Sequence, residues 1–168
     1  MTIAQAFLEE FSEEMATTRR VLERVPGGNP GWKPHPESFS IAHLAQLLSF
    51  MPGWVTNAVR DTELNLAGFA GYSNEKTSDL LATFDKHVTE AKAALAAAKD
   101  ADLAVTWSLK RGPVVMLSMP HGAVVRQTIN HIVHHRGQMT VYLRLNDIAV
   151  PSIYGPTADE RMPVVPPV

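Results

Sequence analysis

Hydrophobic residues recur at steps of three and four along four stretches of the chain, and this spacing marks one face of an α-helix. The stretches cover residues 3–25, 40–59, 78–99 and 121–146. The third also contains many alanines, which favour helix on their own. The pattern therefore predicts four amphipathic helices, each with one apolar face to bury.

The segments between these helices differ in composition. Residues 26–38 are rich in proline and glycine and predict a loop, after which Ser38 or Ser40 can cap the second helix. Residues 61–77 also predict a loop. Pro52 and Gly53 fall inside the second apolar stripe, where we expect them to kink or interrupt the helix.

A different pattern precedes the last helix. Two runs of β-prone residues flank Arg111-Gly112-Pro113, which predicts a hairpin-like excursion. The tail from residue 148 is rich in proline and is expected to run extended over the surface. With no repeat and no second domain evident, we expect a single domain over residues 1–168. Its predicted fold is all-α, an antiparallel four-helix bundle with a short hairpin-like excursion before the last helix.

Composition narrows the classes of function. The chain has no cysteine, which excludes disulfides, thiolate nucleophiles and cysteine metal sites. A formal charge of −2 without a basic face argues against a nucleic-acid partner. The first residues do not resemble a signal peptide, and no stretch approaches the length of a membrane span. We therefore expect a cytoplasmic protein with neither a nucleic-acid nor a membrane partner.

Candidate chemistry concentrates in the fourth predicted helix, where three of the seven histidines fall within five residues. His131 and His135 are one turn apart on one face, the spacing with which two imidazoles on a helix bind one metal ion. His134 lies about 100° away around the helix axis. The competing interpretation is a solvated or hydrogen-bonded histidine pair. No glutamate follows His131, so the helix does not carry the HExxH arrangement of metalloproteases.

A third ligand would have to come from another helix. His43, beside the apolar stripe of the second helix, is the best candidate. The alternative is an ordinary histidine at the edge of the core.

Longer segments resemble a known family. The run "NHIVHHRGQMTVYLRLNDIAVPSIYGPTADE" is similar to the C-terminal signature of the DinB/YfiT-like metal-dependent proteins. "KPHPESFSIAHLAQLLSFMPGW" resembles the second-helix region of that family, and "TWSLK…MPHGAVVRQTIN" resembles its approach to the last helix. The resemblance runs from about Lys33 to Glu160.

The resemblance implies that His131 and His135 bind a divalent metal ion, with Zn²⁺ or Ni²⁺ most plausible. The family's third histidine aligns with Leu47, and His43 stands one turn earlier, about 5.4 Å along the helix axis. His43 is therefore expected either to replace that ligand or to leave a degenerate site. Gln138 is expected to hydrogen-bond a ligand imidazole from the second coordination shell.

The remaining residues of the HHRGQ run also have interpretations. His134 is expected to face neighbouring polar groups. The charge of Arg136 is expected to pair with a carboxylate in the loops, and Gly137 to permit the close approach of another backbone.

Two functions remain open. The resemblance implies a metal-dependent hydrolase or a thiol-dependent transferase that acts on a small molecule, in a homodimer. Because the chain lacks cysteine, any thiol must come from a low-molecular-weight cosubstrate. The alternative is a non-catalytic, stress-associated dimeric helical bundle with a structural or degenerate metal site.

Overall fold

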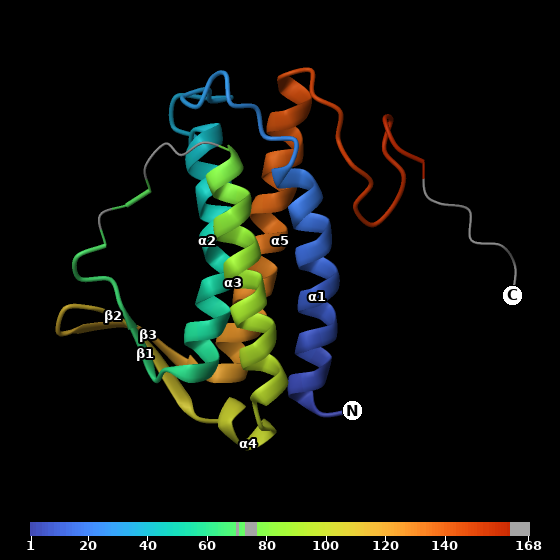
Figure 1. Cartoon of the computed structure of the whole chain (residues 1–168). Helices are drawn as coiled ribbons and strands as arrows, with labels where there is room; N and C mark the ends of the chain where they lie inside the picture. The colour runs from blue at the N-terminus through green and yellow to red at the C-terminus, as the bar shows by residue number, and fades with distance from the viewer. Residues whose placement is uncertain (70, 73–76, 162–168) are drawn as a thin grey trace, which may run out of the picture.

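The computed structural model describes residues 1–69, 71–72 and 77–161 and is mostly helical, with a small sheet on one side (Figure 1). The long helices lie side by side, and their bounds agree with the predicted ranges to within three residues: α1 (Ile3–Leu22), α2 (Ile41–Arg60), α3 (Thr77–Ala97) and α5 (His121–Leu145). Helices α1 and α2 each pack against α3 and α5. In the described part of the chain, no helix is both long enough and apolar enough to span a bilayer.

The predicted apolar faces form the core between these helices. Phe11, Met15 and Leu22 of α1 are buried against Leu48 and other residues of one continuous apolar cluster. Ser40 is the cap of α2, because its hydroxyl accepts a hydrogen bond from the backbone nitrogen of His43 at 3.1 Å. This cap sets where α2 begins, and therefore which face His43 occupies.

The expected break at Pro52-Gly53 does not occur, since α2 continues through both residues. Met51 and Val55, on either side, are fully buried, so packing outweighs the hydrogen bond that proline cannot donate. Gly53 has a different role: a Cβ atom there would lie 3.2 Å from the His87 ring of α3. The glycine therefore permits α2 and α3 to approach closely at this level.

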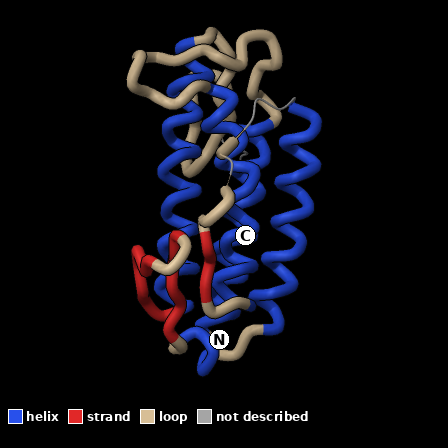
Figure 2. Tube along the Cα trace, turned by 90° about the vertical axis from the view of Figure 1, so that its left-hand side faces the viewer, coloured by secondary structure: helices blue, strands red, loops and turns tan. Residues whose placement is uncertain are grey.

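The predicted excursion is confirmed as a hairpin. Strands β2 (Thr106–Arg111) and β3 (Val114–Pro120) pair antiparallel, and Gly112 takes a positive φ of 59° at the turn. The loop prediction for residues 61–77 is wrong in part, because β1 (Glu63–Asn65) pairs parallel to β2. A short helix, α4 (Asp100–Leu103), was also not expected. The all-α prediction therefore misses a three-stranded sheet of order β1-β2-β3, which lies beside the helices (Figure 2).

The tail has no regular secondary structure up to Arg161 and returns from α5 towards α1 (Figure 1). The side chain of Arg24 on α1 donates to Glu160 at 2.6 Å, and the partly buried Ile148 and Ile153 pack against the core. The tail is thus held by charge and by apolar contacts. The rest of the predicted extended segment, residues 162–168, lies outside the described residues.

Candidate metal and ligand site

A pocket of about 920 Å³ lies between α2, α5, the sheet and the segment that follows β1. Side chains from all four parts of the chain line it, and most of them are aliphatic or aromatic. Its volume and its apolar lining are those of a small-molecule site. The sheet that the sequence did not fully predict therefore forms one wall of this pocket.

His131 and His135 meet on the α5 wall of this pocket. Their Nε2 atoms are 2.8 Å apart, and their ring centroids are separated by 4.5 Å. Trp54 of α2 contacts the His131 ring at a centroid distance of 5.9 Å. The helical spacing thus directs two imidazole nitrogens to one point on an otherwise largely apolar surface.

Gln138 fixes the tautomer of His135. Its side-chain oxygen, which can only accept, lies 2.7 Å from Nδ1 of His135, so Nδ1 carries the proton and Nε2 presents its lone pair towards His131. The amide nitrogen of Gln138 lies 3.1 Å from Nε2 of His134. His134 and Gln138 therefore form a polar chain behind His135, where the sequence placed them.

His43 lines the same pocket from α2, and so does Leu47 one turn later. The His43 ring stacks on the Phe39 ring, with 4.3 Å between the ring centroids. It also packs edge to face with Tyr72, with 5.1 Å between the centroids. Among the described residues, no three histidine, aspartate or glutamate side chains come together as a group that could hold a metal ion. The role of His43 as a third ligand stays a prediction.

Burial lowers the pKa of all three pocket histidines below the ordinary value of 6.5. Desolvation is the largest cause for each; the positive charge of Lys33 adds to it at His43, and neighbouring histidines add to it at His131. The hydrogen bond that His135 donates to Gln138 opposes the shift at His135. The imidazoles are therefore neutral at pH 7, which is the form that binds metal.

Comparison with known proteins identifies the family and the fold. The sequence model of the DinB family matches residues 1–162. The chain belongs to the DinB family. Two solved structures have the same fold: a DinB-like protein from Bacillus cereus ATCC 10987 and the DinB-like protein YjoA from Bacillus subtilis.

The likeness to these two DinB structures is in fold more than in sequence. Each superposes with a TM-score of 0.68. The Bacillus cereus protein is 21% identical, and the match covers 89% of this chain and 97% of that protein. YjoA is 17% identical, and the match covers 88% of this chain and 97% of YjoA. A curated relative, the uncharacterised protein YrdA of Bacillus subtilis strain 168, is 50% identical over 42 residues. That match spans a quarter of this chain and a quarter of YrdA.

The donor set of the DinB chain fits a divalent ion in part. With metal–nitrogen bonds of about 2.05 Å, two nitrogens of a tetrahedral ion lie about 3.3 Å apart, and two neighbouring nitrogens of an octahedral ion about 2.9 Å apart. The observed 2.8 Å between Nε2 of His131 and Nε2 of His135 matches the octahedral value. Without an ion the same contact is a hydrogen bond, in which Nε2 of His131 donates to Nε2 of His135, the hydrogen-bonded pair of the competing interpretation. To bind an ion, His131 would have to move this proton to Nδ1, and non-protein ligands would have to complete the shell.

Two interpretations of the HHRGQ run need correction. Arg136 does not pair with a loop: it is 1% exposed, and its guanidinium lies 2.6 Å from the carboxylate of Glu14 on α1. In the described part of the chain, nothing outside its own helix turn lies within 4 Å of a Cβ atom placed on Gly137, so this glycine does not serve a close backbone approach. Neither could be predicted from the sequence, because both depend on how α1 and the tail pack against α5.

Sequence reasoning also missed most of the pocket wall. Trp107, Leu109 and Arg111 of β2 all line the cavity, and their spacing of two residues is the signal that could have grouped them on one strand face. His121, the first residue of α5, is buried, and neither of its ring nitrogens has a hydrogen-bond partner in the described structure. It does not line the pocket, so we assign it no role in the site.

Proposed function

We propose that this DinB protein binds a divalent metal ion through His131 and His135 and acts on a small molecule held in the adjoining pocket. We also propose that the long helices α1, α2, α3 and α5 form the four-helix bundle that the sequence predicts. The observation that carries the proposal is the convergence of the two Nε2 atoms, 2.8 Å apart, on the wall of a cavity of about 920 Å³.

The chemistry is that of metal-assisted hydrolysis or thiol transfer. A divalent ion at this position would act as a Lewis acid and lower the pKa of a water or thiol. Gln138 holds His135 in the ligating tautomer, and the apolar walls exclude bulk water. His43 lines the same pocket, and its lowered pKa keeps it neutral, so where it is not a ligand it could accept the proton of the nucleophile. The thiol, where one is used, is a cosubstrate.

The preferred metal follows from the spacing of the nitrogens. From their hydrogen-bonded distance of 2.8 Å, the two nitrogens would have to separate by about 0.1 Å for a six-coordinate ion such as Ni²⁺ and by about 0.5 Å for tetrahedral Zn²⁺. We therefore expect Ni²⁺ to bind at least as tightly as Zn²⁺.

The decisive experiment is a calorimetric metal titration of tag-free protein. We expect one ion per chain for the wild type, and loss of binding in His131→Ala and in His135→Ala. His35→Ala, which alters a loop histidine remote from the cluster in sequence, is the control and should bind as the wild type does. Unchanged stoichiometry in both cluster variants would remove the site.

The pH dependence of metal binding has a definite sign. Because the pKa values of His131 and His135 lie below 6.5, both ligands are neutral above that value, and protonation competes with the metal only as the pH falls further. Affinity should therefore hold from pH 8 to about 6.5 and fall below it. Titrations at several pH values check this. A loss of affinity that begins above pH 7 would contradict the proposed ligands.

A second candidate is a non-catalytic bundle whose metal site is structural or degenerate. The observation in its favour is the lack of a three-donor group among the described residues. The two candidates differ in what the pocket does: a substrate site binds small molecules, whereas a structural site raises only stability. A metal that raises the melting temperature of the protein, with no small-molecule binding in the presence or absence of metal, would favour this second candidate.

A further inference from the structure

The polar groups that line the pocket divide into two sets, and the first set is already engaged within the protein. The side-chain oxygen of Asn65 accepts hydrogen bonds from the backbone nitrogens of Ala67 at 2.9 Å and Gly112 at 3.0 Å. Trp107 donates to the side chain of Asn57 at 3.1 Å. These bonds hold the segment after β1, the hairpin and α2 together, so they build the wall and are not free for a ligand.

The second set remains open. Within the described structure, the guanidinium of Arg111, the indole nitrogen of Trp54 and the hydroxyl of Tyr72 make no hydrogen bond or ion pair, although all three residues line the pocket. Burial raises the pKa of Tyr72 to about 12, so its hydroxyl stays protonated and able to donate. Gln127 adds one amide. Among the described residues no carboxylate lines the cavity, so apart from the histidines of the metal site the groups left for a ligand are mainly donors, and one of them is a full positive charge.

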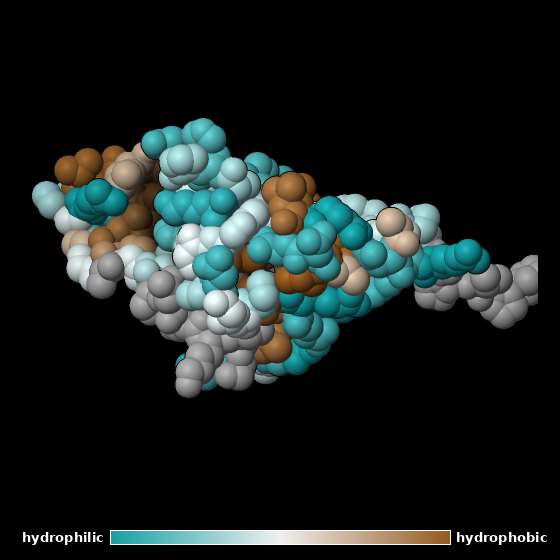
Figure 3. Space-filling model, turned by 90° about the horizontal axis from the view of Figure 1, so that it is seen from above, coloured by the Kyte–Doolittle hydropathy of each residue, from teal (hydrophilic) through white to brown (hydrophobic). Residues whose placement is uncertain are grey.

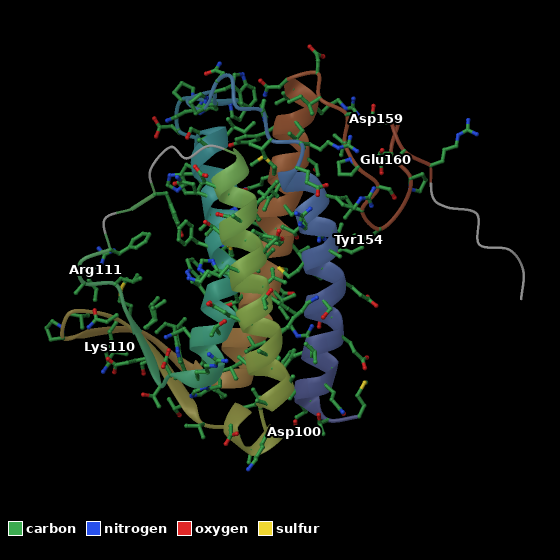
Figure 4. The ribbon with its side chains drawn as sticks, in the orientation of Figure 1. Asp100, Lys110, Arg111, Tyr154, Asp159 and Glu160 are labelled. Atoms are coloured by element: carbon green, nitrogen blue, oxygen red, sulfur yellow. The ribbon has the colours of Figure 1, made fainter. Side chains whose placement is uncertain are left out.

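The position of Arg111 follows from the alternation of β2. Trp107, Leu109 and Arg111 face the pocket, whereas Lys110 lies on the other face of the strand and pairs with Glu63. Figure 4 shows Arg111 on the side of the segment that follows β1 and Lys110 on the opposite side of the hairpin. Strand geometry separates residues 107 and 111 by about 13 Å.

The pocket wall formed by β2 therefore has a buried inner end and an exposed outer end. Trp107 is 4% exposed at the inner end of β2, and Arg111 is exposed at the hairpin tip. Trp54, on the α2 wall, adds a second large ring to the apolar surface. A ligand that fits this order has an apolar body directed inwards and an acceptor or negative charge directed outwards.

We propose that the pocket binds a small organic monoanion, with an aromatic or aliphatic body against Trp54 and Trp107 and a carboxylate at Arg111. Arginine suits this role because its planar guanidinium can donate two parallel hydrogen bonds to one carboxylate. The inference rests on the proposed function only in treating the pocket as a ligand site. The carboxylate contacts Arg111 and not the metal, so the preference for an anion does not require metal.

The test compares two probes with the same body, 4-phenylbutanoate and 4-phenylbutanamide, by calorimetry on chelator-treated protein. We expect the wild type to bind the carboxylate about fivefold more tightly than the amide. Arg111→Gln should bind both probes equally, with its affinity for the amide unchanged. Lys110→Gln is the matched control, because it removes a neighbouring charge from the opposite strand face, and it should keep the preference. Raising the salt concentration to 0.5 M should reduce the preference in the wild type.

Three results would overturn the proposal. A preference that survives in Arg111→Gln would place the carboxylate elsewhere. A preference that exists only after Ni²⁺ is added, and is lost in His131→Ala, would place the carboxylate of the probe on the metal. This result would support the proposed function and remove the present inference. Failure of both probes to bind, together with a normal metal titration, would leave the metal site standing and exclude the pocket as a site for such anions.

Discussion

His43 and Leu47 stand one helical turn apart on the wall of the same pocket, so one substitution at each position can test the composition of the metal shell. If His131 and His135 are the only protein ligands, His43→Ala should leave metal affinity unchanged, whereas a third ligand at His43 would make this variant weaken binding. Leu47→His should tighten binding by supplying a third imidazole, at a stability cost of a few kcal/mol for the lost aliphatic burial. Competition with a metal indicator dye measures both. A loss in His43→Ala as large as that in His131→Ala would make His43 a ligand.

Individual contacts of this site could be predicted from the sequence only where helix geometry fixes them. The contact of His131 with His135 follows from their separation of four residues on one helix. The hydrogen bond that His135 donates to Gln138 follows in the same way from a separation of three residues. The stacking of His43 on Phe39 does not, because Phe39 precedes the helix and its place depends on tertiary contacts. One of these is the hydroxyl of Tyr142, which donates to the carbonyl of Phe39 at 3.1 Å.

At the scale of elements, two ion pairs join α1 to α5 and differ mainly in burial. Arg136, 1% exposed, pairs with Glu14, whereas Arg126 pairs with Glu10 on the surface, where both side chains are at least one-third exposed. Arg136→Met should lower the free energy of unfolding by about 3 kcal/mol, because it leaves the Glu14 carboxylate without its cation. Arg126→Met should cost less than about 1 kcal/mol. Urea unfolding of both variants measures the difference. Equal costs would contradict the role of burial.

The elements themselves were predictable to different degrees. The four long helices could be predicted from the sequence, because their apolar residues repeat over many turns. Strand β1 was not, because three residues cannot show an alternation, and its partner Ser108 is far away in the sequence. Helix α2 ran through Pro52 because packing on both sides compensates for the missing hydrogen bond. Sequence patterns thus predicted the helices and the β2–β3 hairpin, but not β1 or the packing by which the sheet completes the pocket.

For the whole molecule, attachment of the tail should depend on pH. A hydrogen bond from Arg144 lowers the pKa of Asp159 below its ordinary 3.8, and the backbone N–H of Ser152 lowers that of Glu160 below 4.5. Because the pKa values of these carboxylates are lower in the folded state, their negative charges stabilise the docked tail at every pH above the ordinary pKa values. That stabilisation is lost as the pH falls through the lowered values. Figure 4 shows both carboxylates on the tail beside α1.

Hydrogen exchange of residues 148–161 measures this attachment. Exchange should be slow at pH 7 and, after correction for the intrinsic rate, faster at pH 3. The Asp159→Asn, Glu160→Gln double variant should already show the faster exchange at pH 7. Glu37→Gln, in the loop before α2, is the control and should leave the tail protected. Protection that persists in the double variant would mean that the apolar contacts alone hold the tail.

We also expect the whole molecule to form a homodimer through the outer strand of its sheet. β3 is at the edge, contains no charged residue, and exposes Val114, Val115 and Met116 by more than half. Figure 3 shows apolar side chains gathered at this end of the molecule. Such an edge is a template for pairing with another strand, and two copies can pair symmetrically.

Light scattering at micromolar concentration should therefore give the mass of two chains. Val115→Lys should reduce it to one, because two like charges would face each other across the paired edges. Val141→Lys changes an equally exposed valine on α5 and should leave the mass unchanged. A wild-type mass of one chain would remove this prediction.

The parallel pairing of β1 with β2 has a consequence for how the chain reaches its folded state. Glu63 and Ser108 pair only after the whole of α3 and α4 has been placed between them, so closing this ladder requires a long loop to be ordered first. The helices can associate earlier through contacts nearer in sequence. The cavity between sheet and helices would therefore be completed late in folding. In stopped-flow refolding, Trp107, whose indole bonds to Asn57 only once the sheet docks on α2, should report a slower phase than helix formation measured by circular dichroism.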